Sequence, residues 1–222
     1  MPGLSFLRLP QGYALMVNLG GGRARVAQLI QAALDDGAGS GLRALYPEEA
    51  GGGALVGVNE RGAAFALLSH SDDARLARLV PAALASATAG GGLERAVAGG
   101  LEGLPPFVLA GVEPVQAPLS LAWDGQTLQR RLYPDDACQL WVGDDAETVR
   151  ARQDFAALMA RLEGLDSAQV LVAQEGYHGA LPWGRHSQVL LMPRQILLRY
   201  MDAPAQAAGL EPQAAWLVRG DG

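Results

Sequence analysis

Short apolar runs separated by turn residues recur along the whole chain, and this pattern predicts many short β-strands. Strands are expected over residues 4–9 and 12–18, with a turn at Pro10-Gln11. Two further runs, 54–58 and 63–68, flank Asn59-Glu60-Arg61-Gly62, where an asparagine and a glycine suit a tight hairpin turn. The remaining expected strands are 107–110, 119–123, 127–133, 139–142, 170–173, 187–192, 196–201 and 216–218.

Helical spacing of apolar residues occurs in four segments. In residues 22–34 the spacing comes from Val26, Leu29, Ile30 and Ala33. The other expected helices cover residues 73–87, which Pro81 would kink, 93–98 and 145–162. Strands outnumber helices but alternate with them, and no linker or internal repeat is visible. A single domain over residues 1–222 is therefore expected.

Composition narrows the class of protein. Half of the 222 residues are hydrophobic and 18% are charged, which is typical of a folded chain. All 17 basic residues are arginine, and together with the excess of alanine and glycine this points to a GC-rich bacterial gene. The net charge is −6 and the arginines are scattered, which argues against a nucleic-acid surface.

Targeting signals are not recognisable in the sequence. No apolar run approaches the ~18 residues of a membrane span, and no leader resembles a signal peptide. The cytoplasm is therefore the expected location. Cys138 is the one cysteine, which excludes an intramolecular disulfide, and its apolar neighbours favour a small core residue over a nucleophile.

Several landmarks follow one another in a familiar order: Leu4–Arg8, Gly12–Asn18, Asn59–Gly62, Pro106–Ala110 and Ala122–Gly125. Together they resemble the NRDE (Asn-Arg-Asp-Glu) family, also called the transport and Golgi organisation protein 2 family, over about residues 1–203. That family is related to N-terminal-nucleophile hydrolases of the choloylglycine hydrolase and penicillin V acylase type. The resemblance implies an α+β fold, a four-layer αββα sandwich whose N-terminal strand is central and begins at a cleft.

The residues that would carry hydrolysis in the resembled family are missing from this chain. The family places a cysteine after Met1, where this sequence has Pro2. Where the family has Asn-Arg-Asp-Glu, this sequence has Asn18-Leu19-Gly20-Gly21. Asn59 stands where the family has an oxyanion donor, but a donor without a nucleophile does not cleave an amide. No catalytic residue is therefore expected, and the resemblance implies a remnant cleft formed by Pro2, Asn18, Asn59, His178 and Arg185.

Other candidate motifs favour structural roles. Gly20-Gly21-Gly22 lacks the spacing and the lysine of a phosphate-binding loop. His178 and His186 are too few for a zinc site, and Ser71 or Asp72 suits the cap of the next helix better than a metal. Neither a metal nor a cofactor is expected.

Three functions remain open at this stage. The first is a non-catalytic member of the NRDE family that accommodates a small molecule in the remnant cleft. The second is an enzyme that uses the amine of Pro2 as a general base, as tautomerases do. The third is a module that binds a protein partner. The ligand and the oligomeric state stay undetermined.

Overall fold

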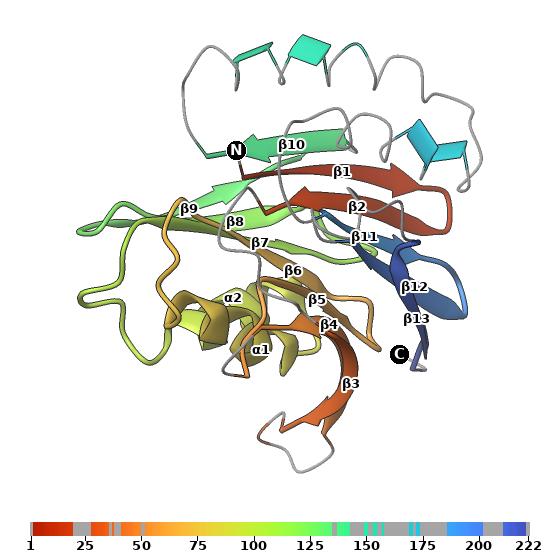
Figure 1. Cartoon of the computed structure of the whole chain (residues 1–222), viewed down its shortest axis with the longest axis horizontal. Coiled ribbons are helices and arrows are strands. Elements are labelled where there is room, and N and C mark those ends of the chain that lie inside the picture. The colour runs from red at the N-terminus through yellow and green to blue at the C-terminus, as the bar shows by residue number, and fades with distance from the viewer. Residues whose placement is uncertain are drawn as a thin grey trace.

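The computed structural model describes residues 2–19, 28–35, 37, 41–49, 52–134, 137–142, 149–150, 153–154, 157, 169–170, 172–173, 186–201 and 211–220. Within these ranges the chain forms two antiparallel sheets packed face to face, with short helices below one of them (Figure 1). All of the strand pairs are antiparallel, so neighbouring strands exchange backbone hydrogen bonds without a crossover helix.

One sheet has six strands and the other has seven. The six-stranded sheet runs in the order β10 (Ala137–Trp141), β1 (Gly3–Leu9), β2 (Gly12–Asn18), β11 (His186–Leu191), β12 (Gln195–Met201), β13 (Gln213–Val218). The seven-stranded sheet follows the sequence in the order β3 (Gln28–Leu34), β4 (Leu42–Glu48), β5 (Val56–Asn59), β6 (Ala64–Leu68), β7 (Phe107–Val112), β8 (Leu119–Trp123), β9 (Leu128–Leu132). The helices are η1 (Leu76–Arg78), α1 (Leu79–Leu84) and α2 (Ala89–Val97).

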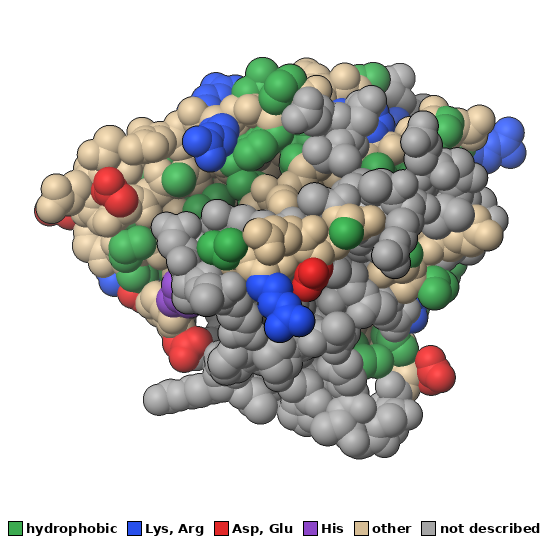
Figure 2. Space-filling model, turned by 90° about the horizontal axis from the view of Figure 1, so that it is seen from above, with side chains coloured by type: hydrophobic (Ala, Val, Ile, Leu, Met, Phe, Trp, Pro, Cys, Tyr) green, Lys and Arg blue, Asp and Glu red, His purple; other side chains and the backbone are tan. Residues whose placement is uncertain are grey.

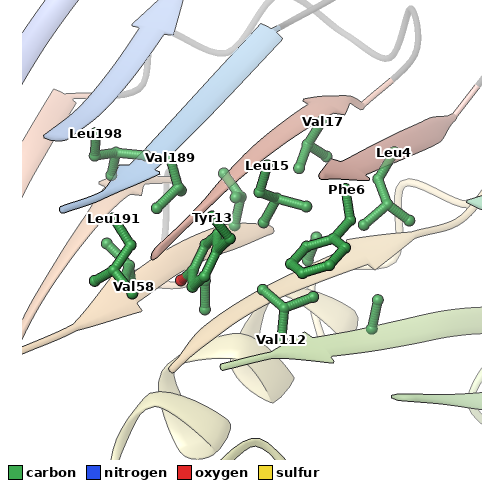
Figure 3. Close-up of a cluster of buried hydrophobic side chains, with 14 of the residues drawn as sticks. Leu4, Phe6, Tyr13, Leu15, Val17, Val58, Val112, Val189, Leu191 and Leu198 are labelled. Carbon is green, nitrogen blue, oxygen red and sulfur yellow. The ribbon is translucent and has the colours of Figure 1, made fainter. Parts of the chain in front are cut away.

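The main core fills the space between the two sheets (Figure 3). Alternate residues of each strand point into it, because side chains along a strand alternate between the two faces. The six-stranded sheet contributes Leu4, Phe6, Tyr13, Leu15 and Val17, among others. This alternation explains why the β1–β2 hairpin is readable from the sequence.

Tyr13 is the polar residue of this core. Its side chain is fully buried, and its ring lies 5.7 Å from that of Phe6. The hydroxyl donates a hydrogen bond to the carbonyl oxygen of Gly62 in the opposite sheet (2.9 Å). Burial raises the pKa of the Tyr13 phenol far above its usual value, so the group stays protonated and remains a donor. The hydrogen bond therefore joins the sheets without leaving a buried polar group unsatisfied.

A second core lies between the seven-stranded sheet and the helices α1 and α2. Phe65 and Leu67 of β6 pack there against Val80, Leu84 and Leu93 of the helices. Thr88 caps α2 by accepting a hydrogen bond from the Gly91 amide (3.2 Å), and the Glu113 carboxylate accepts one from the Ala89 amide (2.5 Å). An acidic group at this end of a helix is favourable, because the free amides carry partial positive charge.

The expected four-layer αββα sandwich is wrong. The described chain is mostly β-structure, and its helices with defined bounds are short and lie on one face of one sheet. The expected helix over 73–87 is reduced to η1 and α1, since Pro81 and the following loop leave little room for a long helix. Within the described residues, no helix is both long and apolar enough to cross a membrane.

The largest local error is the helix expected over residues 22–34. Residues 28–34 form the edge strand β3, while residues 20–27 lie outside the described ranges. Ile30, Ala32 and Leu34 pack on the helix-side core in the period of two that a strand requires. Leu29 packs against the other core, and the adjacent pair Leu29-Ile30 followed by Ala33 imitates a helical spacing.

Strand β4 was not among the expected strands either. In the structure β5 pairs only with Ala44 and Leu45 of β4. Pro47 pairs with Leu29 of β3, beyond the part of β4 that has a neighbour on both sides. A proline is tolerated there because it interrupts no central ladder.

Two expectations fall partly on residues that the structure does not describe. The few described positions within the expected helix 145–162 are helical. The strand expected over 170–173 is wrong at its described positions, which are also helical. Val170 packs with Ala14, Leu190 and Leu197 on the outer face of the six-stranded sheet.

Two glycines of α2, Gly90 and Gly92, give a matched test of the packing between α2 and β6. A Cβ at Gly92 would overlap the Phe65 ring, whereas a Cβ at Gly90 would meet only the end of the Arg130 side chain at 3.7 Å. We expect Gly92→Ala to lower the free energy of unfolding by about 1–3 kcal/mol through overpacking. Gly90→Ala should raise it by roughly 0.5–1 kcal/mol, because alanine loses less backbone entropy in a helix. Urea denaturation of both variants measures the difference, and equal effects would contradict the close approach of α2 to β6.

Candidate functional site

Pro2 and Asn18 lie at the same end of the six-stranded sheet. Asn18 is the last residue of β2 and stands opposite Gly3 of β1 on one side and His186 of β11 on the other. Pro2 is buried, and its carbonyl oxygen accepts a hydrogen bond from the Val142 amide (3.1 Å). The structure therefore brings these two predicted residues to neighbouring strands, together with His186.

Asn18 and His186 both belong to the face of the sheet that points away from the main core. Leu15 and Val17 of β2 point into the space between the sheets, so Asn18 points to the opposite side. The Asn18 side chain is fully buried and His186 is 7% exposed. Ser5 and Gln188 lie on the same outward face and are also buried.

Asn59 does not join this group. It ends β5 in the other sheet, and its side chain points toward the helices. The amide nitrogen donates to the carbonyl oxygens of Leu84 (3.0 Å) and Ser86 (2.7 Å) at the end of α1. The amide oxygen accepts hydrogen bonds from the backbone amides of Arg61 and Ala63, both at 3.1 Å.

These four hydrogen bonds use the whole hydrogen-bonding capacity of the Asn59 amide nitrogen and its oxygen lone pairs. The expectation that Asn59 would face Pro2 across a cleft is therefore not met. The side-chain oxygen of Asn59 accepts hydrogen bonds within its own hairpin turn, as asparagine often does. The side-chain nitrogen donates to the backbone at the end of α1. The segment Asn59–Gly62 therefore has a structural role in this chain, and we call it the clamp.

The remaining predicted residues, His178 and Arg185, lie outside the described residues. Gly20 and Gly21 lie outside them as well. Cys138 is partly buried and packs against the main core, in line with the small core residue expected from its neighbours.

A pocket of about 560 Å³ lies where the two sheets meet, and we call it the inter-sheet pocket. Most of its wall comes from the seven-stranded sheet and its loops, while Val142 follows β10 of the other sheet. The lining residues are Ser69, His70, Ser71, Pro106, Phe107, Val108, Ala122, Trp123, Asp124, Thr127, Gln129 and Val142. The pocket does not include Pro2, Asn18 or Asn59, although Pro2 is hydrogen-bonded to the backbone of Val142.

Ser69 and His70 form hydrogen bonds between the segments that make up the pocket wall. The Ser69 hydroxyl donates to the carbonyl oxygen of Pro106 (2.8 Å) and accepts from the Ser71 amide (3.0 Å). His70 Nε2 lies 3.1 Å from the carbonyl oxygen of Val142. A carbonyl oxygen only accepts, so Nε2 carries a proton and donates in this contact.

Asp124 has a different role at the rim. Its Oδ1 atom accepts hydrogen bonds from the backbone amides of Thr127 (2.7 Å) and Gln126 (2.8 Å). These two bonds hold the pKa of the Asp124 carboxyl below its usual value, so the group is ionised at neutral pH. The carboxylate thus closes the Asp124-Gly125 turn, where Gly125 has a φ of 101°.

The segment His70–Asp73 contains residue types that could bind a metal. In the structure Ser71 accepts from the Asp73 amide (3.2 Å), and Asp73 forms an ion pair with Arg75 (2.6 Å). Across the described part of the chain, no three His, Cys, Asp or Glu side chains gather in a way that could hold a metal ion. His70 lies in the inter-sheet pocket with β7, β8 and Val142, and no sequence motif predicted this position.

Charged side chains do not gather into a patch on the face that Figure 2 presents, where described arginines and acidic residues are interspersed. This arrangement gives no phosphate-binding stripe among the described residues of that face.

Comparison with known proteins assigns the chain to no family. No family model matches the chain, and no curated protein matches it. Among solved structures, the chain aligns with an Anbu (Gly-1) mutant from Hyphomicrobium sp. strain MC1 at 9% identity, covering 99% of this chain and 87% of that one, with a TM-score of 0.36. A likeness at this level supports no argument about function.

The role of Asn59 can be tested with two substitutions. Asn59→Ala removes four hydrogen bonds and leaves buried backbone groups unsatisfied, so the free energy of unfolding should fall by about 3 kcal/mol. Asn59→Asp keeps the oxygen that accepts from Arg61 and Ala63 but loses both donors to α1. We expect Asn59→Asp to be strongly destabilised as well, as measured by urea denaturation at pH 7. Wild-type stability of this variant would show that only the turn, and not the bond to α1, matters.

Proposed function

We propose that the protein is a non-catalytic binding protein that holds a small, mainly apolar molecule in the inter-sheet pocket. The observation that carries this proposal is the pocket itself. Its volume of about 560 Å³ falls within the roughly 300–1,000 Å³ typical of small-molecule sites. Pro106, Val108, Ala122 and Val142 give it an apolar wall, with a few polar groups at the edge.

The state of the polar lining groups supports binding over catalysis. The Ser69 proton is donated to a backbone carbonyl, and His70 Nε2 faces another carbonyl. A nucleophilic serine instead needs a base that accepts its proton. Asp124 binds the amides of its own turn and does not orient His70. These side chains stabilise the pocket wall, and shape and apolar contact would then select the ligand.

Kinship with the NRDE family is part of the proposal and rests on the landmarks quoted from the sequence. Under this view the chain lost the thiol of the family at Pro2 and its arginine and aspartate at Leu19 and Gly20. The Asn59 amide nitrogen is hydrogen-bonded to the backbone at the end of α1. None of the four positions that correspond to family residues (Pro2, Leu19, Gly20 and Asn59) would therefore take part in catalysis.

A second candidate is an enzyme with Pro2 as its general base. The position of Pro2 favours it, because Pro2 is buried and bonded to the backbone of Val142, which lines the pocket. Loss of Met1 would expose a secondary amine whose pKa falls in apolar surroundings. Tautomerisation of phenylpyruvate that disappears in Pro2→Gly would replace the binding proposal with this one.

Binding can be measured with N-phenyl-1-naphthylamine, a neutral apolar fluorophore. The wild-type chain should bind one equivalent saturably and gain thermal stability by mass action. Ala122 lines the pocket, so Ala122→Leu should weaken binding about tenfold, equivalent to ~1.4 kcal/mol of steric cost. Ala98→Leu is the control, because Ala98 is exposed and outside the pocket. Equal affinity of the Ala122→Leu variant and the wild type would remove the support for this pocket.

Hydrolytic activity provides the complementary test. The purified chain should not hydrolyse penicillin V, conjugated bile salts or N-acyl amino acids, as monitored by release of the free amine. Pro2→Cys should remain inactive, because a nucleophile without its supporting residues does not rebuild a site. Turnover by the wild type that is lost in Asn59→Ala, with the variant still folded, would overturn the non-catalytic reading.

A further inference from the structure

Strand β9 ends the seven-stranded sheet and pairs, among the described strands, with β8 alone. All five of its side chains are exposed. Two of them are large and apolar, since Leu128 is 38% exposed and Leu132 is 60% exposed. The outer backbone groups of an edge strand can form hydrogen bonds with another extended chain, which makes such a strand a site for pairing.

The register of the β8–β9 hairpin shows which backbone groups of β9 face outward. The Asp124 amide donates to the carbonyl oxygen of Thr127 (3.3 Å), and the Tyr133 amide donates to that of Pro118 (2.8 Å). Hydrogen-bonded and non-bonded pairs alternate along an antiparallel ladder, so every second residue between these two pairs directs its N–H and C=O groups away from β8. These outward-facing residues are Leu128, Arg130 and Leu132.

Side chains of β9 divide between the two faces of the sheet. Leu128 and Leu132 stand opposite Trp123 and Leu119, which belong to the helix-side core, so both leucines and Arg130 between them lie on that face. Gln129 and Arg131 lie on the opposite face. A strand that pairs with β9 would therefore meet two leucines and one arginine on the helix side, and glutamine and arginine on the other side.

Charge separates β9 from the rest of the chain, which carries a net charge of −6. Arg130 lies 3.5 Å from Glu94, but these side chains are 58% and 74% exposed, so the ion pair contributes little. Arg131 forms neither an ion pair nor a side-chain hydrogen bond within the described part of the chain. The edge is thus cationic on both faces of the sheet.

The arginines discriminate between possible partner strands. If two copies of β9 paired antiparallel with full overlap, Arg130 of one copy would stand directly opposite Arg130 of the other. Like charges in directly opposite positions are destabilising, so this edge is protected against pairing with itself. A strand with carboxylates at the same positions would instead be attracted to the edge.

We propose that β9 binds an extended acidic segment of a partner protein, which adds an antiparallel strand to the seven-stranded sheet. Backbone hydrogen bonds would form with Leu128, Arg130 and Leu132, and side chains would set the specificity. In its own direction, the segment would carry apolar, acidic, acidic, polar and apolar residues opposite residues 132 to 128. The proposal does not rest on ligand binding in the inter-sheet pocket, although Gln129 also lines that pocket.

Isothermal titration calorimetry with the peptide acetyl-Thr-Val-Glu-Glu-Thr-Val-Thr-amide tests the proposal. It should bind saturably at one site. N-methylation of the second glutamate, which would pair with Arg130, removes an N–H group that points into the ladder and should weaken binding about tenfold. N-methylation of the first glutamate, whose N–H group would point away from β9, is the matched control and should leave the affinity close to that of the parent peptide. Absence of saturable binding would overturn the proposal, and so would equal affinity of the two methylated peptides, since charge attraction alone would then explain binding.

Variants of the protein locate the binding site. Arg130→Glu and Arg131→Glu should each weaken binding of the parent peptide about tenfold or more, because each places like charges opposite one another. Arg78→Glu is the control, since Arg78 is exposed, lies in η1 and undergoes the same change of charge. All three side chains are exposed, and circular dichroism checks that the variants are folded. An equal loss of affinity in Arg78→Glu, or wild-type affinity in both folded β9 variants, would overturn the proposal.

Discussion

The β5–β6 turn, Asn59 to Gly62, is the contact on which the arrangement of the layers depends. The carbonyl oxygen of Gly62 accepts a hydrogen bond from the Tyr13 hydroxyl of the six-stranded sheet. The Asn59 side chain donates hydrogen bonds to carbonyl oxygens at the end of α1, on the helix side of the seven-stranded sheet. Glu60 forms an ion pair with Arg43 of β4. Three residues of this one turn thus connect the two sheets and the helices. Since buried polar groups cost stability unless they are bonded, these bonds fix the relative position of the layers.

That constraint also bears on the inter-sheet pocket. The pocket lies where Val142 of one sheet faces the loops of the other. The hydrogen bond from Tyr13 to Gly62 holds these two sheets together. A rigid scaffold of this kind suits recognition by shape and charge, because few groups need to be ordered when a ligand binds.

Sequence reasoning succeeded where local pattern and tertiary environment agree. The β1–β2 hairpin alternates cleanly because one face is buried between the sheets, and β8 was delimited by the apolar run from Leu119 to Trp123. It failed for β3, whose apolar residues imitate a helical spacing, and for β4, which was not expected. It also failed for Asn59, because a hairpin asparagine and an oxyanion donor have the same sequence and differ only in the direction of one side chain. The inter-sheet pocket could not be foreseen, since it depends on contacts between segments far apart in the chain.

The clamp has a consequence for the order in which the chain assembles. The Gly220 amide donates to the carbonyl oxygen of Glu60 (3.0 Å), next to β13, which pairs with β12. The turn therefore has partners on both sides of it in the sequence, at residue 13 and at residue 220. Contacts between such distant residues slow folding, because the loop between them must be closed first. The β5–β6 turn would thus form first as a local hairpin, and its bonds to residues 13 and 220 would form later, when the two sheets come together.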